Sequence, residues 1–161
     1  MIQTITPFLW FDKNAEEAMN FYVSVFKDSK IVSIQRYPDG PLGRPMQGME
    51  GKVLTSVFEL SGQRFMTLDG GPVFKFSEAI SFYVECADQA EVDYYWSKLS
   101  AVPEAEQCGW LKDKFGLSWQ IIPRQMSELM SNPDKEKAGR VIQAMLQMKK
   151  IDIAALEAAA A

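Results

Sequence analysis

Histidine is absent from the 161 residues of this chain, and cysteine occurs only twice, at Cys86 and Cys108. Without imidazole, the chain lacks the side chain that most often acts as a general base or as a nitrogen ligand for a metal ion. Two cysteines do not make the disulfide framework of a small secreted protein. These absences argue against histidine-based catalysis and predict a reduced, cytoplasmic setting.

Long apolar segments and basic clusters are also missing. The longest apolar runs are far shorter than the roughly 20 residues that a membrane-spanning helix needs. The first residues, MIQTITPFLWFDKNAEE, have no basic region ahead of an apolar one and do not resemble a secretory signal. The formal net charge of −4 argues against a nucleic-acid partner, which would require clustered Lys and Arg. We therefore expect a soluble globular protein that engages neither membrane nor nucleic acid.

What the chain does contain is one strand–helix pattern twice, at an offset of 74 positions. Asn14 precedes the first predicted helix with Glu17 three residues on, and Asp88 precedes the second with Glu91 three residues on. Each pair fits a capping box, in which both side chains accept hydrogen bonds from free backbone N–H groups. The apolar helix positions repeat at the same offset: Ala18 and Val92, Phe21 and Tyr95, Tyr22 and Trp96, Val25 and Leu99. A duplicated unit restricts the fold to a few options.

The remaining elements follow from apolar patterns and turn residues. In the first half we predict strands at 4–11, 30–37, 52–60 and 63–69 and a helix at 14–26. In the second half we predict strands at 79–85, 103–107, 109–114 and 117–123 and a helix at 88–99. A loop at 38–51, rich in Gly and Pro, could cover a ligand or reach across a dimer interface.

The last part of the chain is predicted to be helical. Residues 125–130 form a short turn, and Asn132 caps the next helix with Pro133 at its first position. Asp152 caps a final helix that runs to residue 159. An apolar stripe along residues 138–146 requires a partner, which is either the sheet of the same chain or a second subunit.

These patterns indicate an α+β fold of two βαβββ repeats with a C-terminal helical extension. Each repeat is expected to form a four-stranded sheet with its helix on one face, and two such sheets side by side would curve into a cup with an open face. We expect one domain at residues 1–124, made of repeats 1–72 and 78–124, followed by the extension at 125–161. A cup between repeats is a natural site for a small molecule.

Long segments of the chain resemble one known family. They are TPFLWFDKNAEEAMNFY, FELSGQRFMTLDGGP, AISFYVECADQAEVDYYWSKL, QCGWLKDKFGLSWQIIP and KAGRVIQAMLQMKKIDIAALE. They are similar to the PhnB-like branch of the vicinal oxygen chelate superfamily, which includes glyoxalase I, bleomycin-resistance proteins and extradiol dioxygenases. The branch is often labelled 3-demethylubiquinone-9 3-methyltransferase. The resemblance implies the cup-like fold above and a homodimer, because paired subunits often complete the cup.

In that superfamily, His, Glu or Gln side chains on four cup-facing strands hold a metal ion. The resemblance carries these positions onto Thr6 or Pro7, Met66, Ile80 or Ser81, and Gln120. Of these, Gln120 alone is an ordinary ligand for the hard or borderline metals of such sites. We therefore expect no metal and no cofactor, which argues against glyoxalase and dioxygenase chemistry. The methyltransferase label lacks its own signature, since Gly70-Gly71 is followed by Pro72 and by no helix pattern.

Strand alternation then selects the candidate ligand-binding residues. If Gln120 faces the cup, so do Ser118 and Ile122, while Trp119 and Ile121 face the helices. The full candidate set is Thr6, Phe8, Trp10, Arg64, Met66, Ser118 and Gln120. Such a surface suits a small aromatic or amphiphilic ligand, although the aromatic side chains could equally fill the cup as core.

Other chemistry-bearing residues have simpler interpretations. Asp69 is expected to close a turn through its side chain. Lys112 and Asp113 are either a hydrogen-bonding pair at a pocket rim or solvated edge residues. Cys108 has no histidine to activate it, so an inert thiol is expected.

Three functions of different classes fit these residues. The first is a metal-free small-molecule-binding homodimer. The second is an enzyme of unknown reaction, either metal-dependent and similar to a lyase or dioxygenase, or a methyltransferase as the family label suggests. The third is a structural or regulatory dimer with a filled cup.

Overall fold

The computed structural model describes residues 4–161. The chain divides into two compact units, Met1–Lys75 and Phe76–Ala161. Each unit carries one copy of the repeated pattern, so the duplication in the sequence corresponds to a duplication of structure. The two units are described in turn.

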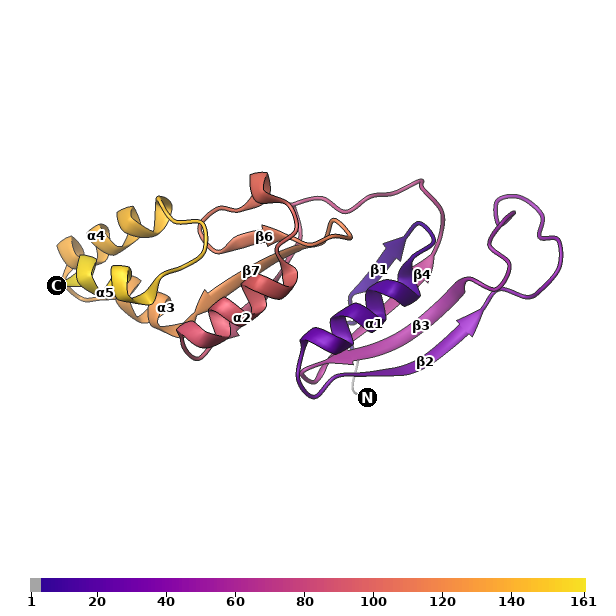
Figure 1. The fold of residues 1–161 in the computed structure, drawn as a ribbon, viewed down its shortest axis with the longest axis horizontal. Coiled ribbons are helices and arrows are strands. Elements are labelled where there is room, and N and C mark those ends of the chain that lie inside the picture. Colours follow the sequence, from indigo (N-terminus) through magenta and orange to yellow (C-terminus); the bar gives the residue numbers. More distant parts are fainter. Residues whose placement is uncertain (1–3) are drawn as a thin grey trace. The chain divides into compact units, whose positions relative to one another are not determined.

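The first unit is a four-stranded sheet with one helix packed on it (Figure 1). Its elements are β1 (Phe8–Phe11), α1 (Ala15–Val25), β2 (Lys30–Arg36), β3 (Val53–Leu60) and β4 (Gln63–Asp69). The strand order is β1-β4-β3-β2; β1 is parallel to β4, and the other pairs are antiparallel. The predicted β-α-β-β-β order is therefore confirmed in this unit, with a first strand shorter than expected.

The core of the first unit lies between α1 and the sheet. Met19 and Tyr22 of α1 are buried, as are Phe58 of β3 and Phe65 of β4. The Tyr22 and Phe58 rings stack at 6.5 Å, and the Phe58 and Phe65 rings at 5.3 Å. Burial of one such side chain contributes about 1.5–3 kcal/mol to stability. This apolar layer fixes one face of the sheet against the helix and leaves the other face uncovered by it.

The second unit repeats this arrangement with one strand fewer. Its elements are β5 (Ser81–Cys86), α2 (Gln89–Leu99), the 3-10 turn η1 (Pro103–Ala105), β6 (Trp110–Lys112) and β7 (Ser118–Pro123). The strand order is β5-β7-β6, with β5 parallel to β7 and β6 antiparallel to it. The parallel β5–β7 pair corresponds to the β1–β4 pair of the first unit.

The predicted strand at 103–107 is wrong. Pro103 begins a 3-10 turn, and the only pairing in this stretch is an isolated bridge between Gln107 and Trp110. Proline fixes its own φ and has no N–H to donate to a strand, so it suits the first turn of a helix better than a ladder. The second sheet consequently has three strands where four were expected.

Three helices follow β7, namely α3 (Arg124–Met130), α4 (Lys135–Leu146) and α5 (Ile153–Ala160). They gather at the end of β7 in Figure 1 and share a core of Val141, Ile151 and Leu156 with Ile122 of β7. Asp152 caps α5 as predicted, by accepting a hydrogen bond from the Ala155 N–H. None of the helices formed by residues 4–161 is long and apolar enough to cross a bilayer.

The helix caps confirm some predictions and correct others. Asp88 accepts the Glu91 N–H at 2.9 Å, as a capping box requires, while the Glu91 carboxylate accepts the N–H of Ala87, just before the cap. Asn14 occupies the cap position of α1 but its side chain makes no capping bond. The cap of α4 is Asp134, which replaces the predicted Asn132 and accepts two backbone N–H groups.

Candidate functional site

The face of the first sheet opposite α1 carries most of the predicted ligand-binding residues. Phe8 pairs with Met66, and Trp10 with Leu68, so their side chains share this face with the exposed Arg64. Phe8 is 48% exposed, whereas Trp10, Met66 and Leu68 are half-buried. Thr6, also half-buried, lies just before β1. We call this surface, with Phe8, Trp10, Met66 and Leu68 as its centre, the first open face.

Trp10 is held in a fixed orientation on this face. Its indole Nε1 donates a hydrogen bond to the Gly71 carbonyl at 2.9 Å, and its ring meets Phe74 edge-on at 5.0 Å. A Cβ at Gly70 would lie 2.2 Å from the Trp10 ring, so only glycine allows this approach. Gly70 and Gly71, which follow β4, therefore position an aromatic side chain.

The equivalent face of the second sheet is more polar. Gln120 on β7 donates from Nε2 to the Ser81 Oγ at 2.9 Å, which places both side chains on the face opposite Trp119. Ser118 lies on the same face by alternation and is 2% exposed. Its Oγ finds no hydrogen-bond partner among residues 4–161. We call this surface the second open face.

Ile122 does not join the ligand-binding candidates as alternation suggested. It is 1% exposed and packs with Val141 of α4, Leu156 of α5 and Ile151 in the connection between these helices. The extension therefore covers the end of β7, and the second open face is confined to the part of the strand that carries Ser118 and Gln120.

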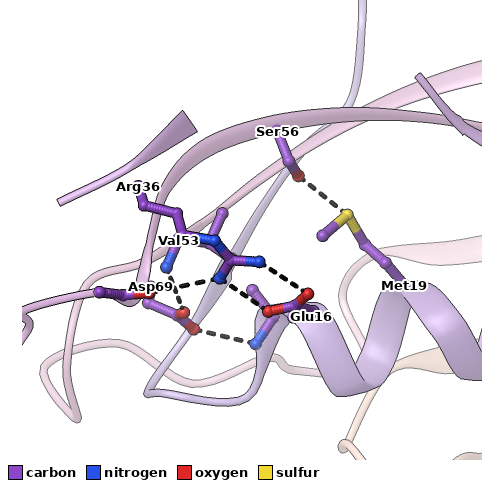
Figure 2. A network of polar contacts seen from close by, with 8 residues as sticks. Glu16, Met19, Arg36, Val53, Ser56 and Asp69 are labelled. Atoms are coloured by element: carbon purple, nitrogen blue, oxygen red, sulfur yellow. Dashed lines mark hydrogen bonds and ion pairs between the residues drawn. The ribbon is translucent and has the colours of Figure 1, made fainter. Parts of the chain in front are cut away.

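A polar network that the sequence did not predict surrounds the start of α1 (Figure 2). Arg36 and Glu16 form a bidentate ion pair with both N–O distances at 2.8 Å. Hydrogen bonding to the Arg36 guanidinium lowers the pKa of Glu16 and raises that of Arg36. These side chains line an open pocket of about 450 Å³ together with Lys13, Lys52 and Asp69. Glu17 and Glu50 also line it, so the pocket carries three cations and four carboxylates and neither sign of charge dominates.

Asp69 is the buried centre of this network. Its side-chain oxygens accept the N–H of Ala15 at 2.9 Å and the N–H of Val53 at 2.9 Å, and its carbonyl accepts the Tyr37 hydroxyl. The carboxylate thus caps α1 from 54 positions away and joins it to β3 and β4. The turn-closing role expected from sequence is replaced by this long-range one.

Asp113 has a comparable role in the second unit. It is 1% exposed and accepts the N–H of Phe115, the N–H of Leu117 and the indole N–H of Trp119. Asp113 is therefore neither paired with Lys112 nor solvated, whereas Lys112 is a half-buried residue of the edge strand β6. Lys112 instead forms an ion pair with Glu78, which lowers the pKa of Glu78.

The residues at the superfamily's metal positions do not fit a metal ion. Met66 offers only a soft thioether, and Ile80, 69% exposed, offers nothing. Gln120 offers a single amide oxygen, while its amide nitrogen donates to Ser81. No group of three His, Cys, Asp or Glu residues placed to hold a metal occurs within residues 4–161.

The two cysteines differ in environment. Cys86 is buried, and burial together with nearby carboxylates raises its pKa to about 12. A thiol with so high a pKa is a poor nucleophile at neutral pH. Cys108 is half-buried, and its sulfur accepts a hydrogen bond from the Gln107 side chain at 3.1 Å.

The chain consists of two units, and each contains a strand, a helix and further strands that form a sheet with one open face. This arrangement is the fold of the vicinal oxygen chelate class of proteins. Residues 3–122 match the family model described as 3-demethylubiquinone-9 3-methyltransferase, and the chain belongs to that family.

Solved structures support this assignment. The PhnB protein from Bacillus cereus is 42% identical over 75% of this chain and 99% of its own, with a TM-score of 0.62. Protein PA1353 from Pseudomonas aeruginosa, 18% identical over 76% of this chain and 98% of its own, has a TM-score of 0.59 and shows the fold alone. No curated protein matches the chain. The family match ends at residue 122, so α3, α4 and α5 lie outside the matched residues.

Proposed function

We propose that this chain is a homodimeric protein that binds a small, largely apolar molecule without a metal ion. The observation that carries the proposal is the first open face. Helix α1 covers one side of the sheet, while the other side presents Phe8, Trp10, Met66 and Leu68. A contiguous apolar surface on a folded domain usually marks a binding site. Aromatic and thioether side chains are common in pockets for apolar ligands.

The rigid placement of Trp10 supports binding over simple core filling. Its ring orientation is fixed by the Gly71 carbonyl and by close approach to Gly70. A side chain held in place loses little conformational freedom when a ligand stacks on it. Thr6 and Arg64 are the polar candidates beside this face, and Ser118 and Gln120 are those of the second open face.

Native mass spectrometry of freshly purified protein tests the proposal most directly. We expect a dimer mass and an organic molecule that leaves on mild denaturation. Stoichiometric metal that is retained by the wild type and lost in Gln120→Ala would refute the metal-free site.

A titration with the neutral dye Nile red identifies the binding face. Phe8→Ser removes a half-exposed aromatic ring, and we expect dye affinity to fall about tenfold, the equivalent of about 1.4 kcal/mol. Val73→Ser is the matched control, because Val73 is 71% exposed and lies outside the sheet. Equal affinity of both variants and the wild type would contradict a site on the first open face.

Methyl transfer, the activity in the family's description, is the second candidate. The residues that follow β4 do not fit the usual cofactor site, since Gly70-Gly71-Pro72 leads into a stretch without helix and α2 begins only at Gln89. We therefore expect no heat of binding when S-adenosylmethionine is titrated into the protein, and saturable binding would favour this candidate.

A further inference from the structure

The second open face carries two successive rows of side chains that differ in chemistry. Each row runs across the sheet and contains one residue from each of β5, β7 and β6, as the pairing registers of these strands show. The aromatic row consists of Tyr83, Gln120 and Trp110. The hydroxyl row consists of Ser81, Ser118 and Lys112. Residues two apart on a strand lie about 7 Å from each other, so the rows are adjacent.

The hydroxyl row is a set of hydrogen-bond donors. Ser81 Oγ accepts from the Gln120 amide, so its own hydrogen is free to donate elsewhere. The Ser118 Oγ is buried without a partner among the described residues. Leaving a buried hydroxyl unpaired is unfavourable, so an unpaired one points to an absent partner. Lys112 adds an ammonium group with three N–H donors.

The cation of this row has an exposed and replaceable partner. Lys112 is paired with Glu78, whose side chain is 63% exposed. The Lys112 side chain is 24% exposed, so water reaches both partners, and an ion pair open to solvent is weak enough for another carboxylate to replace Glu78. Glu78 thus occupies the place of an anionic ligand group.

The aromatic row lies immediately beyond these donors. Tyr83 is 51% exposed and Trp110 is half-buried, one on each side of Gln120. Aromatic side chains at a surface bind planar rings through stacked or edge-to-face contacts. A ligand that spans both rows therefore needs an aromatic ring at one end and a group that accepts several hydrogen bonds at the other.

We propose that the second open face binds an aromatic carboxylate, with its ring against Tyr83 and Trp110 and its carboxylate on Ser81, Ser118 and Lys112. The proposal rests on the proposed small-molecule function and names the class of ligand. It also assigns a binding role to four residues that strand alternation from Gln120 did not select, namely Lys112, Ser81, Tyr83 and Trp110.

The test is an amide NMR titration of the full-length protein with trans-cinnamate and with its neutral analogue cinnamamide. We expect cinnamate to shift the amide signals of Ser81, Ser118 and Gln120 in a saturable way. Cinnamamide keeps the ring but lacks the charge, so we expect it to bind about tenfold more weakly, because charge-assisted hydrogen bonds are about twice as strong as neutral ones.

Three variants separate ligand binding from a structural role. Lys112→Met and Ser118→Ala should weaken cinnamate binding about tenfold and several-fold, respectively. Glu78→Gln should strengthen it several-fold, because it frees the Lys112 ammonium from its competitor. A purely structural Lys112–Glu78 pair predicts no gain in affinity from Glu78→Gln, so this variant keeps the test decisive even if Lys112→Met destabilises the fold.

The outcomes also separate this proposal from the proposed function. Equal binding of cinnamate and cinnamamide, with shifts on β1 and β4 only, would overturn the carboxylate site while supporting an apolar ligand on the first open face. Cinnamate binding that Glu78→Gln leaves unchanged would also overturn the proposal. Absence of any saturable shift with either compound would overturn it as well, and retention of an organic molecule in native mass spectrometry would then still support the broader function.

Discussion

Replacement of Asp69 by alanine is expected to destabilise the first unit more than any change at the formal cap of α1. The Asp69 side chain is 1% exposed and accepts two backbone N–H groups, from Ala15 and Val53. Asp69→Ala leaves both donors buried without an acceptor. Each unsatisfied donor costs about 1–3 kcal/mol, so we expect the free energy of unfolding to fall by about 2–5 kcal/mol. That is a large share of the 5–15 kcal/mol typical of a folded domain.

Asn14→Ala is the matched control. Replacing a capping Asn by Ala ordinarily costs about 0.5–2 kcal/mol. Here the Asn14 side chain makes no capping bond, and Asp69 accepts the N–H of Ala15, the first residue of α1. We therefore expect Asn14→Ala to cost less than about 0.5 kcal/mol. Asp69→Asn should fall between the two, since its amide keeps one acceptor oxygen.

Urea unfolding followed by circular dichroism gives the overall loss of stability. Hydrogen exchange of the Ala15 and Val53 amides reports the first unit by itself, which matters because two compact units can unfold separately. We expect both amides to exchange much faster in Asp69→Ala. If Asn14→Ala proves as costly as Asp69→Ala, or if exchange of the two amides is unchanged, capping by a distant carboxylate is refuted.

Three further perturbations test other parts of the structure. Gly109→Ala should lower the free energy of unfolding by about 2–4 kcal/mol in urea denaturation, because φ is +83° and the new Cβ would lie 2.5 Å from Ile122 Cδ1; a neutral effect would contradict the packing. Iodoacetamide at pH 8 should label the half-buried Cys108 and spare Cys86, because burial raises the pKa of the Cys86 thiol to about 12. Mass spectrometry after labelling of the native protein identifies the modified cysteine. Glu16→Gln should cost at most about 1 kcal/mol, because both partners of the ion pair are largely exposed. Because the pKa of Glu16 in the folded protein lies below its ordinary value of 4.5, this contribution is present above pH 4.5 and is lost as the pH falls through the folded pKa. Thermal unfolding at pH 7 and pH 2.5 should show a larger difference between wild type and variant at pH 7.

The repeated strand–helix pattern was predictable because it depends on local sequence. Helices α1 and α2 and their preceding strands were located correctly from apolar periodicity and turn residues. The caps were less predictable, because capping depends on which acceptor group the folded chain places next to the free backbone N–H groups. Asp88 lies next to α2 and caps it, whereas at α1 the Asn14 side chain makes no capping bond and the buried Asp69 accepts the N–H of Ala15. A residue 54 positions away cannot be found from local patterns.

The candidate site was predictable in its alternation and unpredictable in its boundaries. Period-two reasoning placed Phe8 with Met66 and Gln120 with Ser118. It could not show that the C-terminal helices cover Ile122, because that contact depends on tertiary packing. Period-two reasoning also could not show that Lys112 pairs with Ser118. Strand β6 has only three residues, so its register against β7 is set by the turn between them and not by a longer apolar pattern.

The shared core at the end of β7 bears on comparison with shorter relatives. Ile122 is the last residue of the family match and also a central residue of the helical extension. A sequence that stops at the equivalent of residue 123 leaves this position available for contact with another subunit. In this chain Val141, Ile151 and Leu156 already occupy that place. If subunits of a shorter relative meet at the end of β7, that arrangement therefore cannot be transferred to this chain. Measurements of self-association of this chain have to include the C-terminal helices.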